Sequence, residues 1–191
     1  MNKGNVIIYE DLLRAHADPM LLRWAWNRDI RWIWSNLRRG DWMIAVALVV
    51  ECPVAFIDRA ASECVVPALR LAGEYRDDMR IELDIHTRWL EGKATAEDNR
   101  DAGRRAAIIA SSAESLRGES LVELWATDSI ARVFAGSFEM AVQVAAEAEG
   151  EAIQARWAAN RARVRSLRDS ADTIRRMVPA ELIEAAAWDL V

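Results

Sequence analysis

Only one pair of side chains in this sequence has a spacing that suggests metal chemistry. Glu82 and His86 are four residues apart, so a helix would place both on one face, within reach of one metal ion. A zinc site needs a third and usually a fourth ligand, and the nearby Asp77 and Asp78 are ordinary for a charged helix. The other histidine, His16, has no candidate partner. We therefore interpret Glu82 and His86 as a solvated ion pair and predict no metal and no cofactor.

The remaining reactive residue types form no recognisable catalytic pattern. Cys52 and Cys64 stand in apolar surroundings without CxxC spacing, so we expect two small buried side chains in a reducing cytosol rather than a zinc site or a disulfide. No GxSxG, P-loop or GxGxxG pattern occurs. No catalytic residue is predicted, and an enzyme or ligand binder with an unrecognised site is kept as an alternative.

Tryptophan and arginine are the residue types most suited to binding a partner. Five of the nine tryptophans fall between positions 24 and 42. On a continuous helix over 19–39, one apolar stripe would hold Leu22, Trp26, Ile30, Ile33 and Leu37. Trp34 would then lie on the polar side, where another helix could cover it or where it could form a binding surface. Because Trp and Arg dominate binding hot spots, we predict a partner-binding face made of Arg23, Arg31, Trp34 and Arg38.

A second candidate surface lies on the last long predicted helix. Residues 151–178 contain seven arginines against Glu151, Asp169 and Asp172, a net charge of +4 in a chain of net charge −5. This side is either a solvated face, bridged to acids on a neighbouring helix, or a binding surface. Direct nucleic-acid binding is not favoured, because it calls for a more basic domain and a recognisable module. The residues concerned are Arg161, Arg165, Arg168 and Arg176.

The elements that carry these residues are predicted to be helices. Apolar residues recur with a helical period at 22–37 and again at 153–178, and neither stretch alternates as a strand would. The only plausible strand is 6–9, and one strand cannot make a sheet. The sequence therefore predicts an all-α fold, a multi-helix bundle with long C-terminal helices.

Local signals place the ends of several helices. Asp18 and Pro19 are typical of a helix start, Gly40 is expected to end that helix, and Asp41 to cap the next one. Prolines predict further helix starts at Pro53, Pro67 and Pro179. Capping pairs predict starts at Thr95 with Asp98 and, after a break at Gly118, at Ser120 with Glu123. Residues 73–78 are predicted to form a loop. We divide the chain into a tryptophan-rich part, 1–118, and an Ala- and Arg-rich part, 119–191, which together are expected to form one continuous domain.

Chain length, apolar content and net charge bear on the location of the protein and on the kind of partner it suits. The chain has 191 residues, enough to bury a core, and its longest apolar run, 42–50, is too short to span a membrane. The start shows no signal peptide, so a cytoplasmic location is expected. A net charge of −5 gives no overall attraction to phosphate backbones and suits a basic partner.

Three segments resemble a known group of proteins. They are the tryptophan-rich stretch leading to Asp41-Trp42-Met43, the stretch RWLEGKATAED at 88–98, and the stretch ADTIRRMVP at 171–179. In this order, with an Ala-rich helical region between the last two, the chain resembles small helical phage and bacterial proteins, some labelled as immunity proteins, over about residues 20–180. It departs from them in having more Glu and Arg and fewer Ala-Ala-Trp units. The family has no accepted catalytic residues to carry over.

The resemblance implies a protein that acts by binding in the conflict between phages and bacteria. We expect a non-enzymatic inhibitor, such as an anti-CRISPR or a toxin immunity protein, whose partner is a host or toxin protein or a ribonucleoprotein complex. The alternative is a nucleic-acid-binding or regulatory protein that uses the arginine face at 161–176. The sequence does not define the oligomeric state.

Overall fold

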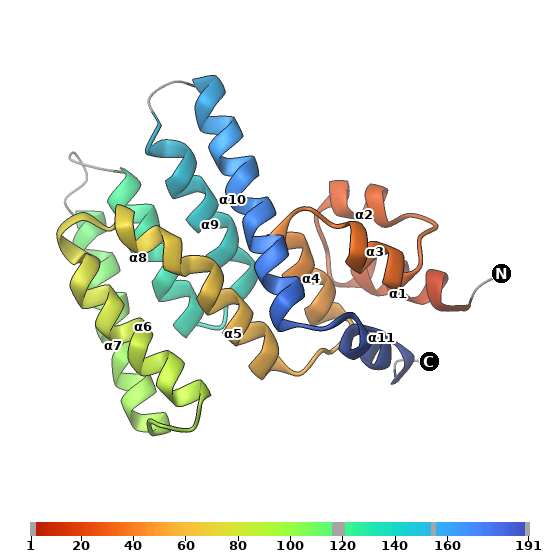
Figure 1. Ribbon diagram of the computed structural model, residues 1–191, viewed down its shortest axis with the longest axis horizontal. Coiled ribbons are helices and arrows are strands. Elements are labelled where there is room, and N and C mark those ends of the chain that lie inside the picture. Colours follow the sequence, from red (N-terminus) through yellow and green to blue (C-terminus); the bar gives the residue numbers. More distant parts are fainter. Residues whose placement is uncertain (1–2, 116–120, 154–155, 190–191) are drawn as a thin grey trace.

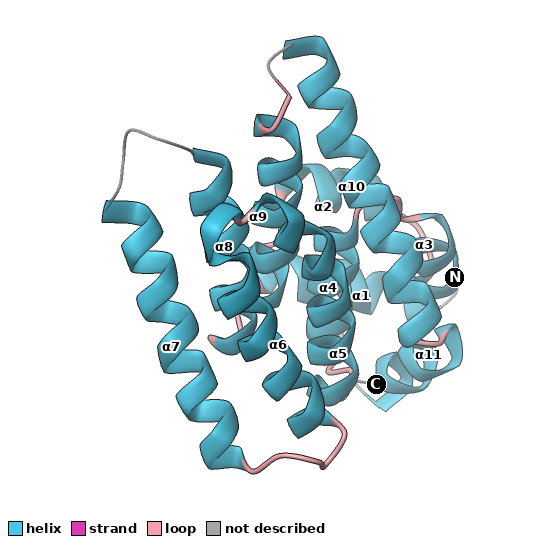
Figure 2. Cartoon of the chain, turned by 60° about the vertical axis from the view of Figure 1, so that its left-hand side comes forward, coloured by secondary structure: helices cyan, strands magenta, loops and turns pink. Residues whose placement is uncertain are grey.

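The computed structural model describes residues 3–115, 121–153 and 156–189, and the predicted all-α fold is confirmed there. Within these ranges the chain forms helices and connecting loops but no strand, as Figures 1 and 2 show. The segment 6–9 lies inside the first helix. The α-helices are α1 (Lys3–Arg14), α2 (Pro19–Ala25), α3 (Ile30–Asn36), α4 (Gly40–Val49), α5 (Val54–Val65), α6 (Arg76–Leu90), α7 (Ala96–Ser115), α8 (Leu121–Phe134), α9 (Phe138–Glu151), α10 (Arg156–Met177) and α11 (Ala180–Asp189). Two 3₁₀ helices, η1 (Val66–Leu71) and η2 (Gly73–Tyr75), connect α5 to α6.

Helix α10 runs through the middle of the molecule and packs against α4, α5 and α9. The short helices α1–α3 lie with α11 at one end, and the α6–α7 hairpin lies with α8 at the other (Figure 1). One buried hydrophobic cluster joins α1–α5 to α9, α10 and α11, and a second joins the end of α5 and η1 to α6–α9. Both clusters combine residues from either side of position 118.

Several helix starts and ends are where the sequence placed them. The Asp18 carboxylate accepts a hydrogen bond from the Met20 N–H at 2.7 Å and caps α2, which begins at Pro19. Thr95 and Asp98 form the predicted reciprocal cap at the start of α7, with the Asp98 N–H donating to the Thr95 hydroxyl at 3.0 Å. Helix α11 begins directly after Pro179, as expected. The predicted break at Gly118 and the cap at Ser120 lie outside the described residues.

The predicted continuous helix over 19–39 is wrong. It is interrupted after Ala25, Asn27 adopts a φ of +57°, and a new helix starts at Ile30. The Asp29 carboxylate accepts a hydrogen bond from the Trp32 N–H at 2.7 Å and caps this second helix. Asn and Asp favour turns and caps over helix interiors, because their short side chains bond to nearby backbone groups.

This interruption reverses the two tryptophans on which the first candidate surface was based. Since the break resets the helical phase, Trp26 is 63% exposed and Trp34 only 2% exposed. Trp34 packs in the first hydrophobic cluster with Ile33 and Leu37. The prediction that Trp26 is core and that Trp34 is surface is therefore wrong for both residues.

Smaller corrections concern other elements. Gly40 does not end a helix but begins α4, and residues 73–78 form η2 and the start of α6 rather than a loop. The helix starts predicted at Pro53 and Pro67 are confirmed, since α5 begins directly after Pro53 and Pro67 lies in the first turn of η1. Of the apolar residues predicted to form one stripe over 153–178, Leu167, Ala171, Ile174 and Val178 are buried, whereas Ile153 and Val164 are 37% and 51% exposed. Among the described residues, no helix combines the length and the apolar character needed to cross a membrane.

Candidate functional site

The candidate site forms where the segment 37–39, between α3 and α4, lies against α10. Gly40 makes this approach possible. A Cβ atom at Gly40 would lie 2.5 Å from the Ser170 Cβ and 3.2 Å from the Ala171 nitrogen, so any side chain there would overlap α10. Glycine thus lets the start of α4 contact the backbone of α10 directly.

Arg175 of α10 also holds this segment, through hydrogen bonds to its backbone. Its Nε donates a hydrogen bond to the Trp34 carbonyl at 3.1 Å, and its Nη2 donates to the Leu37 carbonyl. These carbonyls lie at the C-terminal end of α3, where helix geometry leaves acceptors without partners and where a cation is favourable. A further bond from Nη1 to Asp172, at 3.0 Å, holds the guanidinium in place. The two residues that follow, Arg38 and Arg39, are thereby positioned beside α10.

Arg39 is held rigidly and is largely compensated. Its Nε and Nη2 donate to the two oxygens of the buried Asp41 carboxylate at 3.1 and 2.5 Å, and its guanidinium lies 4.3 Å from the centre of the Trp42 ring. Burial opposes the charge of Arg39, but the hydrogen bond and charge of Asp41, with Asp18 and Glu139 nearby, raise its pKa. This arginine therefore acts as a fixed part of the site.

Arg163 enters the site from α10. Its Nη2 lies 2.5 Å from the Glu147 carboxylate of α9. Gly150 of α9 lies next to it, since a Cβ atom there would be 3.4 Å from both the Nε and the Nη2 of Arg163, an ordinary contact distance. The Nε is buried and has no hydrogen-bond partner among the described residues. Arg163, like Arg39, is fixed and compensated.

Arg38, Arg39, Arg163 and Arg168 line one pocket of about 570 Å³ between α9, α10 and the segment 37–39. We call it the arginine pocket. Two of its arginines are neutralised by Asp41 and Glu147. The other two, Arg38 and Arg168, are exposed, and within the part of the chain that the structure describes neither forms an ion pair. The pocket is therefore positively charged, with two guanidinium groups available to a ligand.

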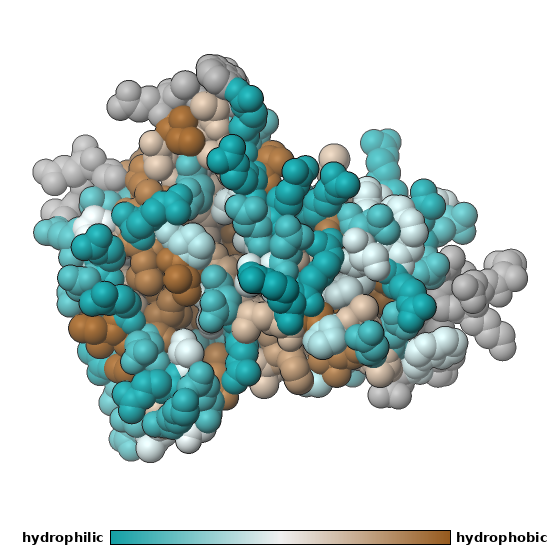
Figure 3. Space-filling view, viewed as in Figure 1, coloured by the Kyte–Doolittle hydropathy of each residue, from teal (hydrophilic) through white to brown (hydrophobic). Residues whose placement is uncertain are grey.

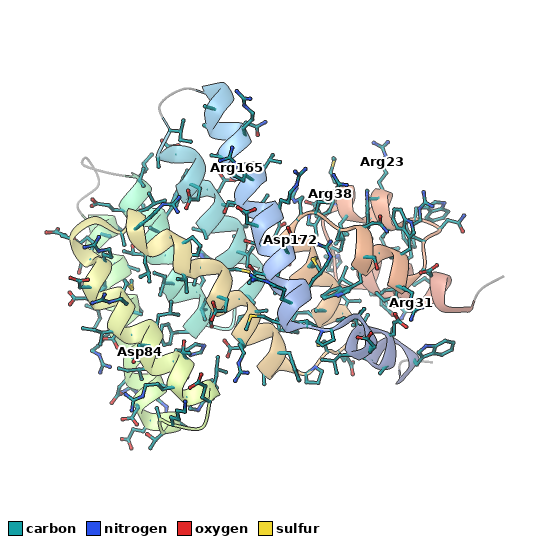
Figure 4. All side chains as sticks on the ribbon, in the orientation of Figure 1. Arg23, Arg31, Arg38, Asp84, Arg165 and Asp172 are labelled. Carbon is teal, nitrogen blue, oxygen red and sulfur yellow. The ribbon has the colours of Figure 1, made fainter. Side chains whose placement is uncertain are left out.

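Arg38 from the first predicted surface and Arg168 from the second line the same pocket, whereas the other predicted residues lie elsewhere. Arg23 points away from the short helices at the upper edge of Figure 4, and neither Arg23 nor Arg165 lines the pocket. Arg31 points toward α11, where its Nε lies 2.6 Å from Glu184, and the hydrogen bond with Glu184 raises its pKa. Trp34 is buried, so the predicted face of Arg23, Arg31, Trp34 and Arg38 does not exist as one surface.

On α10 the four predicted arginines also separate. Arg168 lines the arginine pocket, and Arg165 lines a different hollow beside Glu149 and Asp169. Arg161 is exposed near the start of the helix, and Arg176 donates to the Thr173 hydroxyl of its own helix at 3.0 Å. Only one of the four thus belongs to the pocket.

Sequence reasoning missed the pocket residues Arg39 and Arg163, and also the amide side chains Gln143 and Asn160 that line it. A partial signal was present. The run Arg38-Arg39-Gly40 places two cations directly before a glycine, and a glycine at a helix start indicates close packing of the backbone. No local pattern pointed to Arg163.

The second charged cluster of the molecule contains Glu82 and His86. They do not pair with each other and they are not solvated, so that interpretation was wrong. His86 is 2% exposed; its Nε2 lies 2.7 Å from the Asp58 carboxylate of α5, and its Nδ1 lies 2.8 Å from the Asn99 side-chain oxygen of α7. Glu82 is 5% exposed and accepts two hydrogen bonds from Arg105 of α7, at 2.7 and 2.8 Å. We call Asp58, Glu82, His86, Asn99 and Arg105 the buried network.

The charge state of His86 follows from these contacts. Burial opposes protonation, but the hydrogen bond and charge of Asp58, with the hydrogen bond to Asn99, raise its pKa. Both ring nitrogens face oxygen acceptors, which the doubly protonated ring satisfies. In the described residues, no three His, Cys, Asp or Glu side chains are placed to hold a metal ion. The network joins α5, α6 and α7. His86 and Glu82 are buried within it, whereas the Arg105 side chain is 50% exposed and lines a small surface pocket.

The cysteines are buried, as predicted. Burial raises the pKa of the Cys52 thiol to about 11 and that of Cys64 to about 12. Both are therefore protonated near neutral pH, and neither is an activated nucleophile.

Comparison with known proteins adds no relative from which a site could be transferred. No family model matches the chain, and neither a curated protein nor a solved structure does. The arginine pocket therefore has to be interpreted from its own geometry.

Proposed function

We propose that this chain is a non-enzymatic protein that binds another protein and blocks it by occlusion. The observation that carries the proposal is the pair Arg38 and Arg168, two exposed cations that frame one pocket and have no partner within the described chain. Arginine is enriched at the energetic centres of protein interfaces, where its planar group binds carboxylates through two hydrogen bonds. A fixed wall of Arg39 and Arg163 keeps the site in shape before a partner arrives.

A protein partner fits this surface better than a nucleic acid. Asp41 and Glu147 neutralise two of the four arginines that line the pocket, so its positive charge comes from Arg38 and Arg168. The residues that line it include no aromatic ring on which a base could stack. Figure 3 shows a largely hydrophilic surface over α10, with hydrophobic residues gathered around α8 instead. Nucleic-acid binding calls for an extended basic stripe, and the whole chain carries a net charge of −5.

The biological setting that we propose is the conflict between phages and bacteria. It is supported by the resemblance of the stretches 88–98 and 171–179, and of the tryptophan-rich segment before them, to small helical phage and bacterial proteins. The target would be a host or toxin protein, or a ribonucleoprotein, with an acidic patch that meets the arginine pocket, whereas the net charge of −5 had suggested a basic partner from the sequence alone. Inhibition by occlusion requires one molecule of inhibitor for each molecule of target.

The test compares the wild type with a variant carrying Arg38→Glu and Arg168→Glu. Each protein is immobilised and exposed to bacterial lysate, and the captured partner is then assayed for activity with increasing amounts of free protein. We expect a stoichiometric complex and stoichiometric inhibition that the double variant loses. The matched control is Arg100→Glu, which reverses an exposed arginine of α7 that has no ion pair among the described residues.

Three results would contradict the proposal. The first is inhibition at a small fraction of the target concentration, which indicates turnover. The second is a complex that the double variant retains in full. The third is tight, salt-sensitive binding to naked DNA or RNA that depends on the same arginines, which would favour the nucleic-acid alternative.

A further inference from the structure

We infer that the arginine pocket receives an acidic peptide segment of the partner, with one carboxylate side chain for Arg38 and another for Arg168. This inference rests on the proposed function and specifies the chemistry of the partner. It uses only the two pocket guanidinium groups that form no ion pair within the described residues, one from the segment before α4 and one from α10.

The charge of the pocket calls for two negative groups. Arg39 and Arg163 already have Asp41 and Glu147 at 2.5 Å each, so they contribute little further attraction. Arg38 and Arg168 are exposed on different elements, and each presents a planar donor group that can bind one carboxylate bidentately. Two acidic side chains that are near each other on one flexible segment match this arrangement.

The size and lining of the pocket favour a peptide over a small anion. A volume of about 570 Å³ lies in the range of sites for organic ligands, roughly 300–1,000 Å³, and a phosphate ion would leave most of it filled with water. Ala146, Val164 and Leu167 supply apolar surface for the methylene groups of Glu side chains. Gln143 and Asn160 supply amide groups that can donate to and accept from a peptide backbone. An inorganic ion would use neither feature.

The pocket is also formed in advance. Gly40 contacts Ser170 directly, and Arg175 bonds to the carbonyls of Trp34 and Leu37, so the segment that carries Arg38 is fixed to the helix that carries Arg168. A binding site with this framework loses little conformational entropy when it is occupied. Measurable affinity for a short peptide is therefore expected without the rest of the partner.

The experiment titrates the full chain into fluorescently labelled peptides and measures anisotropy. The probe is a short peptide of glutamates separated by glycine and serine, and the same peptide with glutamine in place of glutamate is the uncharged control. We expect only the glutamate peptide to bind, and Arg38→Gln and Arg168→Gln each to weaken it about tenfold, as the loss of one charge-assisted hydrogen bond does. Arg100→Gln is expected to leave the affinity unchanged. Circular dichroism and thermal unfolding verify that every variant is folded.

Each alternative outcome is informative. Equal binding of the glutamate and glutamine peptides overturns the inference, as does unchanged affinity in both pocket variants. Efficient displacement of the peptide by inorganic phosphate would identify a phosphate site, and tighter arginine-dependent binding of a single-stranded oligonucleotide would identify a nucleic-acid site; both overturn it. If no peptide binds although the captured lysate complex still depends on Arg38 and Arg168, this inference fails and the proposed function stands.

Discussion

In the buried network, each charged group has a partner on another helix, whereas in the arginine pocket Arg38 and Arg168 have none within the described chain. Both clusters combine carboxylates with cations, and a simple count of charges would not separate them. The two clusters differ in whether their charged groups already have partners and in whether those groups are exposed to solvent. His86 and Glu82 are almost fully buried and use their hydrogen-bonding capacity internally, while the two free arginines remain in water.

This difference indicates which cluster serves the fold and which can serve binding. A buried charge without a partner is costly, so the network has to be complete for α5, α6 and α7 to pack together. An exposed arginine costs almost nothing when it is unpaired, and its bonds remain available for a ligand. Substitutions should therefore affect stability in the network and affinity in the pocket.

The largest expected effect is the loss of stability on His86→Leu. Removing the imidazole leaves the Asp58 carboxylate buried without its partner, which should cost about 3–5 kcal/mol in the free energy of unfolding. Urea unfolding followed by circular dichroism measures this. The control is the double variant Asp58→Leu with His86→Leu, in which both partners are apolar and much of the loss should be recovered. A loss below about 1 kcal/mol in the single variant would show that the network does not stabilise the fold.

A smaller loss is expected at the base of the pocket on Gly40→Ala. The added Cβ would meet the Ser170 Cβ at 2.5 Å, and overpacking of this kind costs about 1–3 kcal/mol. Chemical unfolding gives the stability, and peptide anisotropy gives the accompanying loss of affinity as the segment 37–39 shifts. Combining the change with Ser170→Gly removes the opposing atom and should restore part of both. Full stability of Gly40→Ala alone would mean that α4 and α10 do not approach this closely.

The pH dependence of the free energy of unfolding also distinguishes the buried network from the arginine pocket. Because the folded state raises the pKa of His86, the charged ring contributes stability that is fully present below the unfolded value of about 6.5 and is lost as pH rises through the folded value. Thermal unfolding of the wild type and of His86→Gln, which cannot titrate, isolates this contribution. The difference between them should be greatest on the acidic side and shrink with rising pH. A difference that grows with pH would indicate a neutral imidazole.

The smallest expected effect is on stability at the pocket rim. Arg38→Ala and Arg168→Ala remove exposed side chains without ion pairs in the described chain, so each should change the free energy of unfolding by no more than about 0.5 kcal/mol. The same urea titrations used for the network provide the measurement. Losses comparable to that of His86→Leu would remove the distinction between the two clusters.

Several helix ends could be predicted from the sequence because they depend on residues that are close together in the chain. The reciprocal cap of Thr95 and Asp98 and the helix starts at Pro19 and Pro179 depend on residues within one turn, and all three are confirmed. The break between α2 and α3 also had a local signal, the pair Asn27 and Asp29. It was missed because apolar residues continue on both sides in an apparent single stripe.

Part of the candidate site was readable as well. Arg38 and Arg168 were among the predicted binding residues, because clusters of arginine are visible in a sequence. Trp34 was wrongly included, since its exposure depended on an unbroken helix that does not exist. Whether an arginine is already paired cannot be seen locally: Arg31 is bound by Glu184, and Arg163 by Glu147. These partners come from other helices.

The sequence by itself therefore determined the helical class, many helix ends and the abundance of arginine, because periodicity and capping involve residues a few positions apart. Only the tertiary structure decided which charges are satisfied and which are free. The contact of Gly40 with Ser170 and the bonds of Arg175 to Trp34 and Leu37 join segments far apart in the chain, and they bring Arg38 beside Arg168. A binding site made of unpaired cations depends on every neighbour that could have neutralised them, and packing alone selects those neighbours.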